Sequence, residues 1–317
     1  ASLSVLHNVQ NYENSTTMGR PGMNKKIVNS YLMADGSRFT DKAGYETMTF
    51  DQECQNRDPR LAQTIRTPGY TRIGSTKKEA PNLAYTMTGY HLIKYSMTAN
   101  YDEYNKSCND IPLFRTAEVY LNFAEAKAEL GTLKQADINK SIKLLRDRVG
   151  MTNLDMELAN SKPDPYLMSA ATGYPNVKGA NQGVILEIRR ERTIELAMEG
   201  FRYYDIMRWK EGKLFENDLL GIYVPGPGTY DLDKDGTDDV CFYVGTKPAG
   251  NVPLYLEIGE QIRLSNGESG YIICHSLITK KWNEDRDYLY PVPISERTLS
   301  NGVITQNPGW NDGLNFN

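Results

Sequence analysis

The strongest constraint on the fold lies between residues 114 and 150, where apolar and small side chains recur at helical spacing. In residues 114–130 the stripe consists of Ala117, Leu121, Ala124 and Ala128, and in residues 138–149 it consists of Ile138, Ile142, Leu145 and Val149. Gly131 and Gly150 follow the two runs as C-terminal caps. The pattern predicts a helical hairpin of about 34 residues, the size of a tetratricopeptide repeat. Because one such unit is not stable alone, we expect other helices to stack on it.

A third helical run is predicted from residue 183 to 209. Its apolar stripe consists of Ile194, Ala197, Phe201 and Tyr204. A second face carries both charge signs three or four residues apart, at Arg192, Glu195, Glu199, Arg202, Asp205 and Arg208. Such spacing favours a ladder of ion pairs along the helix.

The remaining segments differ in character. Residues 1–110 are rich in turn signals and predict long folded loops, whereas residues 111–219 form the helical core. Residues 220–280 predict a small β-rich insertion with strands at 240–244, 254–258, 262–264 and 271–277. Residues 281–317 contain several prolines and asparagines and predict an irregular strap over the helices. We therefore expect a single domain, 1–317, that is mainly α, with tetratricopeptide-like hairpins, long irregular loops and this small insertion.

Composition excludes several classes of protein. The 36 Lys and Arg residues against 40 Asp and Glu residues argue against a nucleic-acid binder. No apolar run approaches the roughly 20 residues of a membrane helix. The four cysteines form no C-x-x-C pair, so a structural zinc site is not expected. Cys241 and Cys274 both lie in predicted strands and could pair, or could be buried free thiols.

Residues 231–239 (DLDKDGTDD) match the first nine positions of a calcium loop. The expected ligands are the side chains of Asp231, Asp233, Asp235 and Asp239 and the carbonyl of Thr237. Position twelve of the pattern is Phe242 rather than the bidentate Glu. The alternative is an acidic Asp-Gly turn that leads into a strand.

Several motifs, in this order and spacing, resemble the RagB/SusD family of outer-membrane nutrient-binding lipoproteins. They are residues 56–61 (NRDPRL), 115–126 (RTAEVYLNFAEA), 144–150 (LLRDRVG), 188–209 (IRRERTIELAMEGFRYYDIMRW), 290–296 (YPVPISE) and 306–310 (QNPGW). The resemblance covers most of the chain and implies a SusD-like fold. Since the lipoprotein signal and the N-terminal helices of the family are absent, the chain resembles the C-terminal portion of such a protein.

The resemblance also implies a role. It implies a lipid-anchored protein of the outer membrane, exposed at the cell surface, that works with a TonB-dependent, SusC-like transporter and captures an oligosaccharide or another nutrient without catalysis. The anchor is absent from this chain. One alternative is a helical-repeat scaffold that binds only proteins.

The opposing alternative is a carbohydrate-active enzyme that would use Glu191, Glu195 and Glu199, which lie one helical turn apart. Each of these glutamates has an arginine within three or four residues, which favours ionised and paired carboxylates over a general acid. We therefore predict no catalytic residues.

The sequence contains 21 Tyr residues against 8 Phe, and rings that carry a hydroxyl suit contact with polar, ring-shaped ligands. Aromatic rings beside polar groups in loops are the candidate sugar contacts, although aromatic rings more often serve as packing anchors or lie on plain surface. The candidates are Tyr70 with Arg72, Tyr85, Tyr90, Tyr174 and Trp282.

Overall fold

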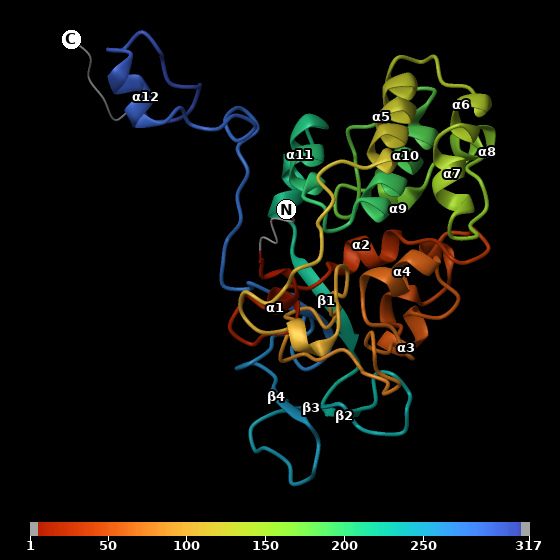
Figure 1. Ribbon diagram of the computed structural model, residues 1–317, viewed down its shortest axis with the longest axis vertical. Coiled ribbons are helices and arrows are strands. Elements are labelled where there is room, and N and C mark those ends of the chain that lie inside the picture. The colour runs from red at the N-terminus through yellow and green to blue at the C-terminus, as the bar shows by residue number, and fades with distance from the viewer. Residues whose placement is uncertain (1–5, 312–317) are drawn as a thin grey trace.

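The computed structural model describes residues 6–311, and Figure 1 shows its arrangement. A group of helices lies at one end and a loop-rich part with two small sheets at the other. Two hydrophobic clusters correspond to these parts. Helix makes up 32% and strand 12%, so the expectation of a mainly α protein is only partly confirmed.

The predicted hairpin forms, with one break. Helix α5, Thr116–Glu129, buries the predicted stripe and packs against α10, Gln182–Glu195. The second helix of the hairpin is split into α6, Gln135–Asn139, and α7, Ile142–Asp147. At the break the buried Ser141 hydroxyl donates to the Asp137 carbonyl at 2.7 Å, whereas the Ser141 N–H donates to the Ile138 carbonyl and not to Asp137 as in a regular α-helix. Helices α8, Met156–Ser161, and α9, Pro165–Met168, follow, and α8 packs on α10.

The run predicted as one helix over residues 183–209 is two helices. Helix α10 ends at Glu195 and α11 spans Phe201–Arg208. Between them Met198 and Gly200 adopt left-handed backbone angles, with φ of 62° and 84°. Left-handed residues cannot continue a right-handed helix. The apolar periodicity persists across this turn, which is why the pattern alone predicted continuity.

The first 110 residues fold mainly as loops, as predicted, around short helices. These are α1 Val9–Glu13, α2 Lys25–Ser30, α3 Phe50–Glu53 and α4 Pro59–Thr64, with 3-10 turns Phe39–Asp41, Tyr45–Thr47 and Ala99–Tyr101. A further 3-10 turn, Gly212–Glu216, follows α11.

The β-rich segment forms two sheets. Strands β1, Leu219–Val224, and β5, Gly270–Cys274, pair antiparallel, with an irregular register between Leu220 and Tyr223. In the second sheet β3, Val240–Tyr243, lies between β2, Gly228–Tyr230, and β4, Leu254–Glu257. Residues 262–264 make only isolated bridges.

The two sheets share their core with the N-terminal part. One hydrophobic cluster contains Tyr31 and Tyr90 together with Ile222 and Phe242. The strands therefore complete the core of the loop-rich part and do not form a separate excursion. The two segments approach closely at Gly221, where an added Cβ would lie 2.2 Å from the Thr88 carbonyl oxygen.

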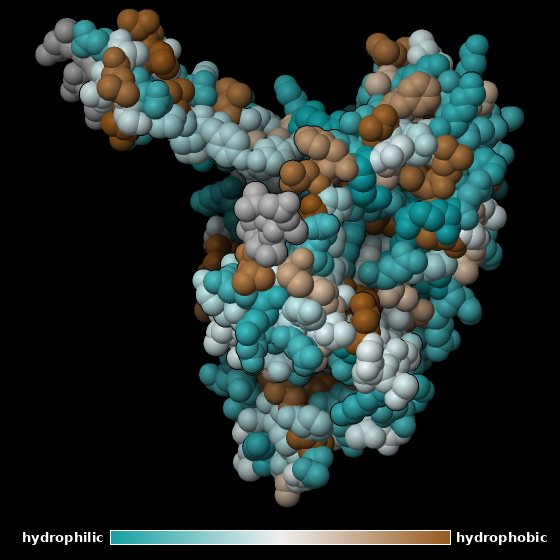
Figure 2. Space-filling view, in the orientation of Figure 1, coloured by the Kyte–Doolittle hydropathy of each residue, from teal (hydrophilic) through white to brown (hydrophobic). Residues whose placement is uncertain are grey.

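The C-terminal segment differs from the predicted irregular strap. Trp282 packs against Phe215 with ring centroids 5.3 Å apart, but the following residues leave the body and contain helix α12, Ile294–Leu299 (Figure 1). Hydrogen bonds close the segment on itself, such as that from Trp310 Nε1 to the Leu289 carbonyl. Figure 2 shows apolar residues on this arm, in agreement with the exposed side chain of Leu299.

The four cysteines are free thiols, so Cys241 and Cys274 do not form the disulfide that was one of the two alternatives. Both are buried. None of the helices in residues 6–311 combines the length and apolarity that a bilayer crossing requires.

Candidate functional site: an acidic loop beside a polar cleft

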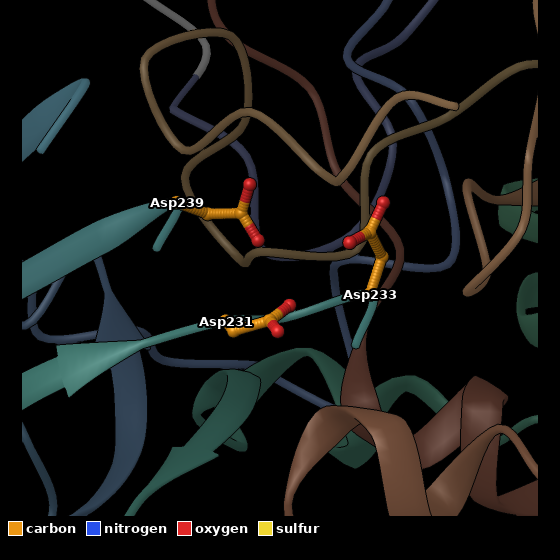
Figure 3. Close-up of side chains that lie close together, drawn as sticks. All are labelled: Asp231, Asp233 and Asp239. Atoms are coloured by element: carbon orange, nitrogen blue, oxygen red, sulfur yellow. The ribbon is translucent and has the colours of Figure 1, made fainter. Parts of the chain in front are cut away.

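Three carboxylates converge at the end of the second sheet. Strands β2 and β3 are antiparallel and pair Tyr230 with Val240, so the loop between them must begin and end at adjacent points. This register brings together Asp231, Asp233 and Asp239, whose nearest carboxylate oxygens all lie within 4.8 Å of one another (Figure 3). Within the described residues, this is the group whose acidic side chains could share a cation.

Backbone N–H groups hold the loop in shape. The Asp231 carboxylate accepts from the N–H groups of Asp235 at 3.2 Å and of Gly236 at 2.9 Å. Asp239 accepts from the N–H of Leu232 at 2.7 Å. Gly236 has φ of 92°, a left-handed conformation that glycine adopts without strain. These bonds fix the carboxylates at the mouth of the loop.

The carboxylates destabilise each other's charged forms. Burial, together with the charges of the neighbouring aspartates, raises the pKa of Asp239 to about 6 against the lowering effect of the Leu232 N–H. Burial, followed by the charge of Asp235, also raises the pKa of Asp233, whose exposed fraction is only 6%. A hard cation would relieve this repulsion, since carboxylate oxygens are the ligands that Ca²⁺ prefers.

One predicted carboxylate ligand, Asp235, lies outside the cluster of three. Asp235 is exposed, and its carboxylate accepts from the Thr237 N–H at 2.8 Å. Phe242, at the twelfth loop position, is buried in the core with 2% exposed and cannot face an ion. The loop therefore provides three convergent carboxylates and leaves much of a calcium shell open.

A cleft of about 550 Å³ joins this loop to a distant part of the sequence. Residues 77–85, with Arg66 and Arg72, form one wall, and residues 233, 235 and 237–240 form part of the other. The structure thus brings together two predicted sugar contacts, Arg72 and Tyr85, with four of the predicted metal ligands. A volume of this size is typical of small-ligand sites.

Other predicted sugar contacts are in the interior. Tyr90 is fully buried and donates its hydroxyl to Glu53 at 2.7 Å. Tyr174 is 3% exposed and packs edge-on against Trp209. The expectation that these two rings present an exposed face was wrong, because their loops turn inward and close over the core.

The other candidates have mixed surroundings. Arg72 is largely buried and pairs with Asp102, although it lines the cleft. Tyr70 is half-buried, with the Arg66 guanidinium 5.3 Å from its ring centre. Trp282 is half-buried and does not line the cleft. It packs against Phe215 and Tyr288.

Sequence reasoning missed the basic wall of the cleft, in particular Arg66 and Lys78. A signal was present, because Arg66, Arg72, Lys77 and Lys78 fall within thirteen positions of one loop-rich stretch. That this stretch faces the acidic loop depends on tertiary packing alone.

The three helical glutamates have structural partners. The Glu191 carboxylate forms ion pairs with the guanidinium groups of Arg60, at 2.5 Å, and Arg146, at 2.8 Å. Burial acts to raise the pKa of Glu191, but the two guanidiniums outweigh it and hold the pKa at about 2. The prediction that Glu191 is an ionised carboxylate paired with arginine is therefore confirmed. Because a glycosidase acid needs a raised pKa, Glu191 is unsuited to that role.

The partners differ from those expected for a ladder along the helix. Glu195 pairs with Arg60, Arg115 and Arg148, and Glu199 pairs with Lys94 and Arg115. These cations come from other elements. Arg60 and Lys94 connect α10 and the turn after it to the loop-rich part, whereas Arg115 and Arg148 lie in the helical part beside α5 and α7. The i,i+3 pair between Arg208 and Asp205 does form along α11.

The fold and the cleft define a helical and loop-rich protein with a polar cleft between two distant parts of its sequence. Comparison with protein families identifies it more closely: residues 5–310 match the SusD family, and the chain belongs to this family. A comparison with curated proteins found no match.

Solved structures support the fold. A SusD-like protein from Bacteroides fragilis NCTC 9343 is 22% identical, with a TM-score of 0.56 over 91% of this chain and 47% of its own. A SusD-like carbohydrate-binding protein from the same organism is also 22% identical, with a TM-score of 0.56 over 87% of this chain and 47% of its own. The chain thus spans about half the length of these structures.

Proposed function

We propose that this chain is a non-enzymatic glycan-binding component of an outer-membrane uptake system. In the full-length protein it would be lipid-anchored at the cell surface and would work with a TonB-dependent, SusC-like transporter. The observation that carries the proposal is the match to the SusD family over residues 5–310. A solved relative of the same fold, described as a carbohydrate-binding protein, supports a glycan as the nutrient.

The cleft beside the acidic loop is the proposed binding region. Its lining combines carboxylates, guanidinium groups and the half-buried ring of Tyr85. Sugar hydroxyls need both hydrogen-bond donors and acceptors, and sugar ring faces pack on aromatic rings. Among the predicted contacts, Arg72 and Tyr85 therefore remain as candidates, whereas the buried Tyr90 and Tyr174 do not.

A glycan array probed with the purified chain tests this function. We expect binding to at least one oligosaccharide class, and no release of shorter sugars on prolonged incubation. Absence of binding to every glycan would contradict the proposal, and hydrolysis of a bound glycan would favour the enzymatic alternative.

We also propose that the acidic loop binds Ca²⁺. Asp231, Asp233 and Asp239 would supply carboxylate oxygens, and Asp235 and the Thr237 carbonyl are the further ligands predicted from sequence. Support comes from the convergence of the three carboxylates within 4.8 Å.

Calorimetric titration with Ca²⁺ tests this site through a matched pair of variants. Asp239→Asn removes a clustered carboxylate, whereas Asp238→Asn makes the same charge change at an exposed neighbour outside the cluster. We expect Asp239→Asn to weaken binding by at least about tenfold, the loss of a charged ligand. Equal affinities of the two variants would contradict the proposed site.

A further inference from the structure

The cleft beside the acidic loop has walls of opposite charge. The wall from residues 66–102 carries Arg66, Arg72, Lys77 and Lys78 against the two carboxylates Glu79 and Asp102. The other wall carries Asp233, Asp235, Asp238 and Asp239. The first wall therefore has an excess of positive charge, and the second is strongly negative. A ligand that fills this cleft must satisfy both.

Arg66 contributes a buried donor that is not satisfied. Only 6% of this residue is exposed, and it pairs with Glu79 at 3.0 Å and donates to the Asn14 side chain at 2.8 Å. Its Nε–H finds no acceptor among the described residues. Because buried donors are nearly always paired, this N–H points to an acceptor oxygen that arrives with a ligand. A carboxylate is the strongest acceptor for a guanidinium.

The acidic wall contributes an incomplete cation shell. Ca²⁺ takes six to eight oxygen ligands, and the loop offers three convergent carboxylates. The position that closes a full calcium loop is occupied by Phe242, which lies in the core. The remaining coordination positions are left for oxygens that come from outside the loop. The cleft, which Asp233 and Asp239 both line, is where such oxygens would enter.

We propose that the cleft binds an acidic oligosaccharide through a shared Ca²⁺. Ring hydroxyls of a uronic acid unit complete the shell of the ion held by Asp231, Asp233 and Asp239. The uronate carboxylate faces the basic wall at Arg66 and Lys78. This inference rests on the glycan-binding function proposed above and names the substrate class and the cation dependence of that site.

The basic wall distinguishes this ligand from a neutral glycan. A neutral sugar could complete the calcium shell, but it would leave the excess positive charge and the Arg66 Nε–H without a charged acceptor. A simple acidic peptide could meet the basic wall but lacks the vicinal hydroxyls that chelate calcium. An acidic sugar supplies both groups within one ring.

The experiment is calorimetric titration of the full chain with an oligogalacturonate and with a neutral galactose oligomer of equal length. Each titration is made in Ca²⁺ and in excess EDTA. We expect the acidic oligomer to bind at least about tenfold more tightly than the neutral one in Ca²⁺, as for a charge-assisted hydrogen bond. In EDTA we expect this binding to be lost.

Two matched pairs of variants assign the effect to the cleft. Asp239→Asn should abolish the calcium dependence. Asp238→Asn removes an equal charge from the same cleft wall but outside the cluster of three carboxylates, and the calcium dependence should persist in it. Lys78→Gln should weaken oligogalacturonate binding about threefold, as for an exposed ion pair. Lys234→Gln makes an equal charge change outside the cleft lining and should leave oligogalacturonate binding unchanged. Because calcium also binds oligogalacturonate in solution, a calcium effect that persists in Asp239→Asn would overturn the inference.

The remaining outcomes separate the two proposals. Equal binding of the acidic and neutral oligomers, or binding that EDTA leaves unchanged, overturns this inference while the glycan-binding function stands. A failure of both oligomers here, together with an empty glycan array, contradicts the function itself.

Discussion

Glu191 provides the sharpest test of what holds the two parts of the molecule together. Its carboxylate is fully buried on α10 and lies 2.5 Å from Arg60 and 2.8 Å from Arg146. Arg60 has other acidic partners, Asp58 and Glu195. Arg146 has no second ion pair among the described residues, so removal of Glu191 leaves a buried charge without compensation.

Two routes give the magnitude. Removal of one partner from a buried ion pair costs about 3–5 kcal/mol. The pKa of Glu191 falls from an ordinary 4.5 to about 2, which corresponds to roughly 3 kcal/mol of favourable interaction with its surroundings. We therefore expect Glu191→Ala to lower the free energy of unfolding by about 3–5 kcal/mol.

Urea denaturation followed by circular dichroism measures this loss. The control is Asp147→Ala, which removes an exposed partner of Lys143 and should cost less than about 1 kcal/mol. If Glu191→Ala costs no more than this control, the network does not stabilise the fold and the reasoning is refuted.

The same carboxylate predicts a pH dependence. Because the folded-state pKa of Glu191 is depressed, its contribution to stability is complete above the unfolded pKa near 4.5 and is lost as the pH falls through about 2. We expect the stability difference between the wild type and Glu191→Gln to shrink over this acid window. A difference that stays constant would contradict the depressed pKa.

Three further predictions concern other parts of the chain. Gly221→Ala should destabilise by about 1–3 kcal/mol in urea denaturation, because its Cβ would meet the Thr88 backbone, whereas Gly226→Ala, with no neighbour closer than 4.0 Å, should be neutral. Cys108 is exposed and should react rapidly with a thiol reagent in the native state, while the buried Cys241 and Cys274 should react only on unfolding. Burial raises the pKa of Glu13 from 4.5 to about 7, so its contribution to stability is complete below about pH 4.5 and is lost as the pH rises through about 7. Glu13→Gln should therefore flatten the decline in melting temperature between about pH 4.5 and about pH 7.

The sequence predicted best those elements whose signal is local. The stripe of α5 could be predicted because its alanines recur at helical spacing within one short segment. These small side chains leave room for the close approach of α10. The break between α10 and α11 was missed, since only Gly200 signals it and the apolar period continues beyond it. The packing of the strands under the N-terminal loops was not predictable, because no residue in 219–274 encodes which distant loop will cover it.

The candidate site likewise has one wall that the sequence predicted and one that it did not. The spacing of the aspartates in residues 231–239 is a local pattern, and the structure brings three of them together. The opposite wall comes from residues some 150 positions earlier, so only the fold could show that Arg66 and Tyr85 face the loop. Tyr90 was misjudged because a tyrosine in a loop looks the same in sequence whether the loop lies on the surface or folds inward.

The most direct test of the central claim is a crystal structure of this chain with Ca²⁺ and a bound oligosaccharide. We expect electron density for the sugar in the cleft between Tyr85 and the acidic loop, with a calcium ion coordinated by Asp231, Asp233 and Asp239. Sugar density at another surface, with this cleft filled only by solvent, would contradict the account.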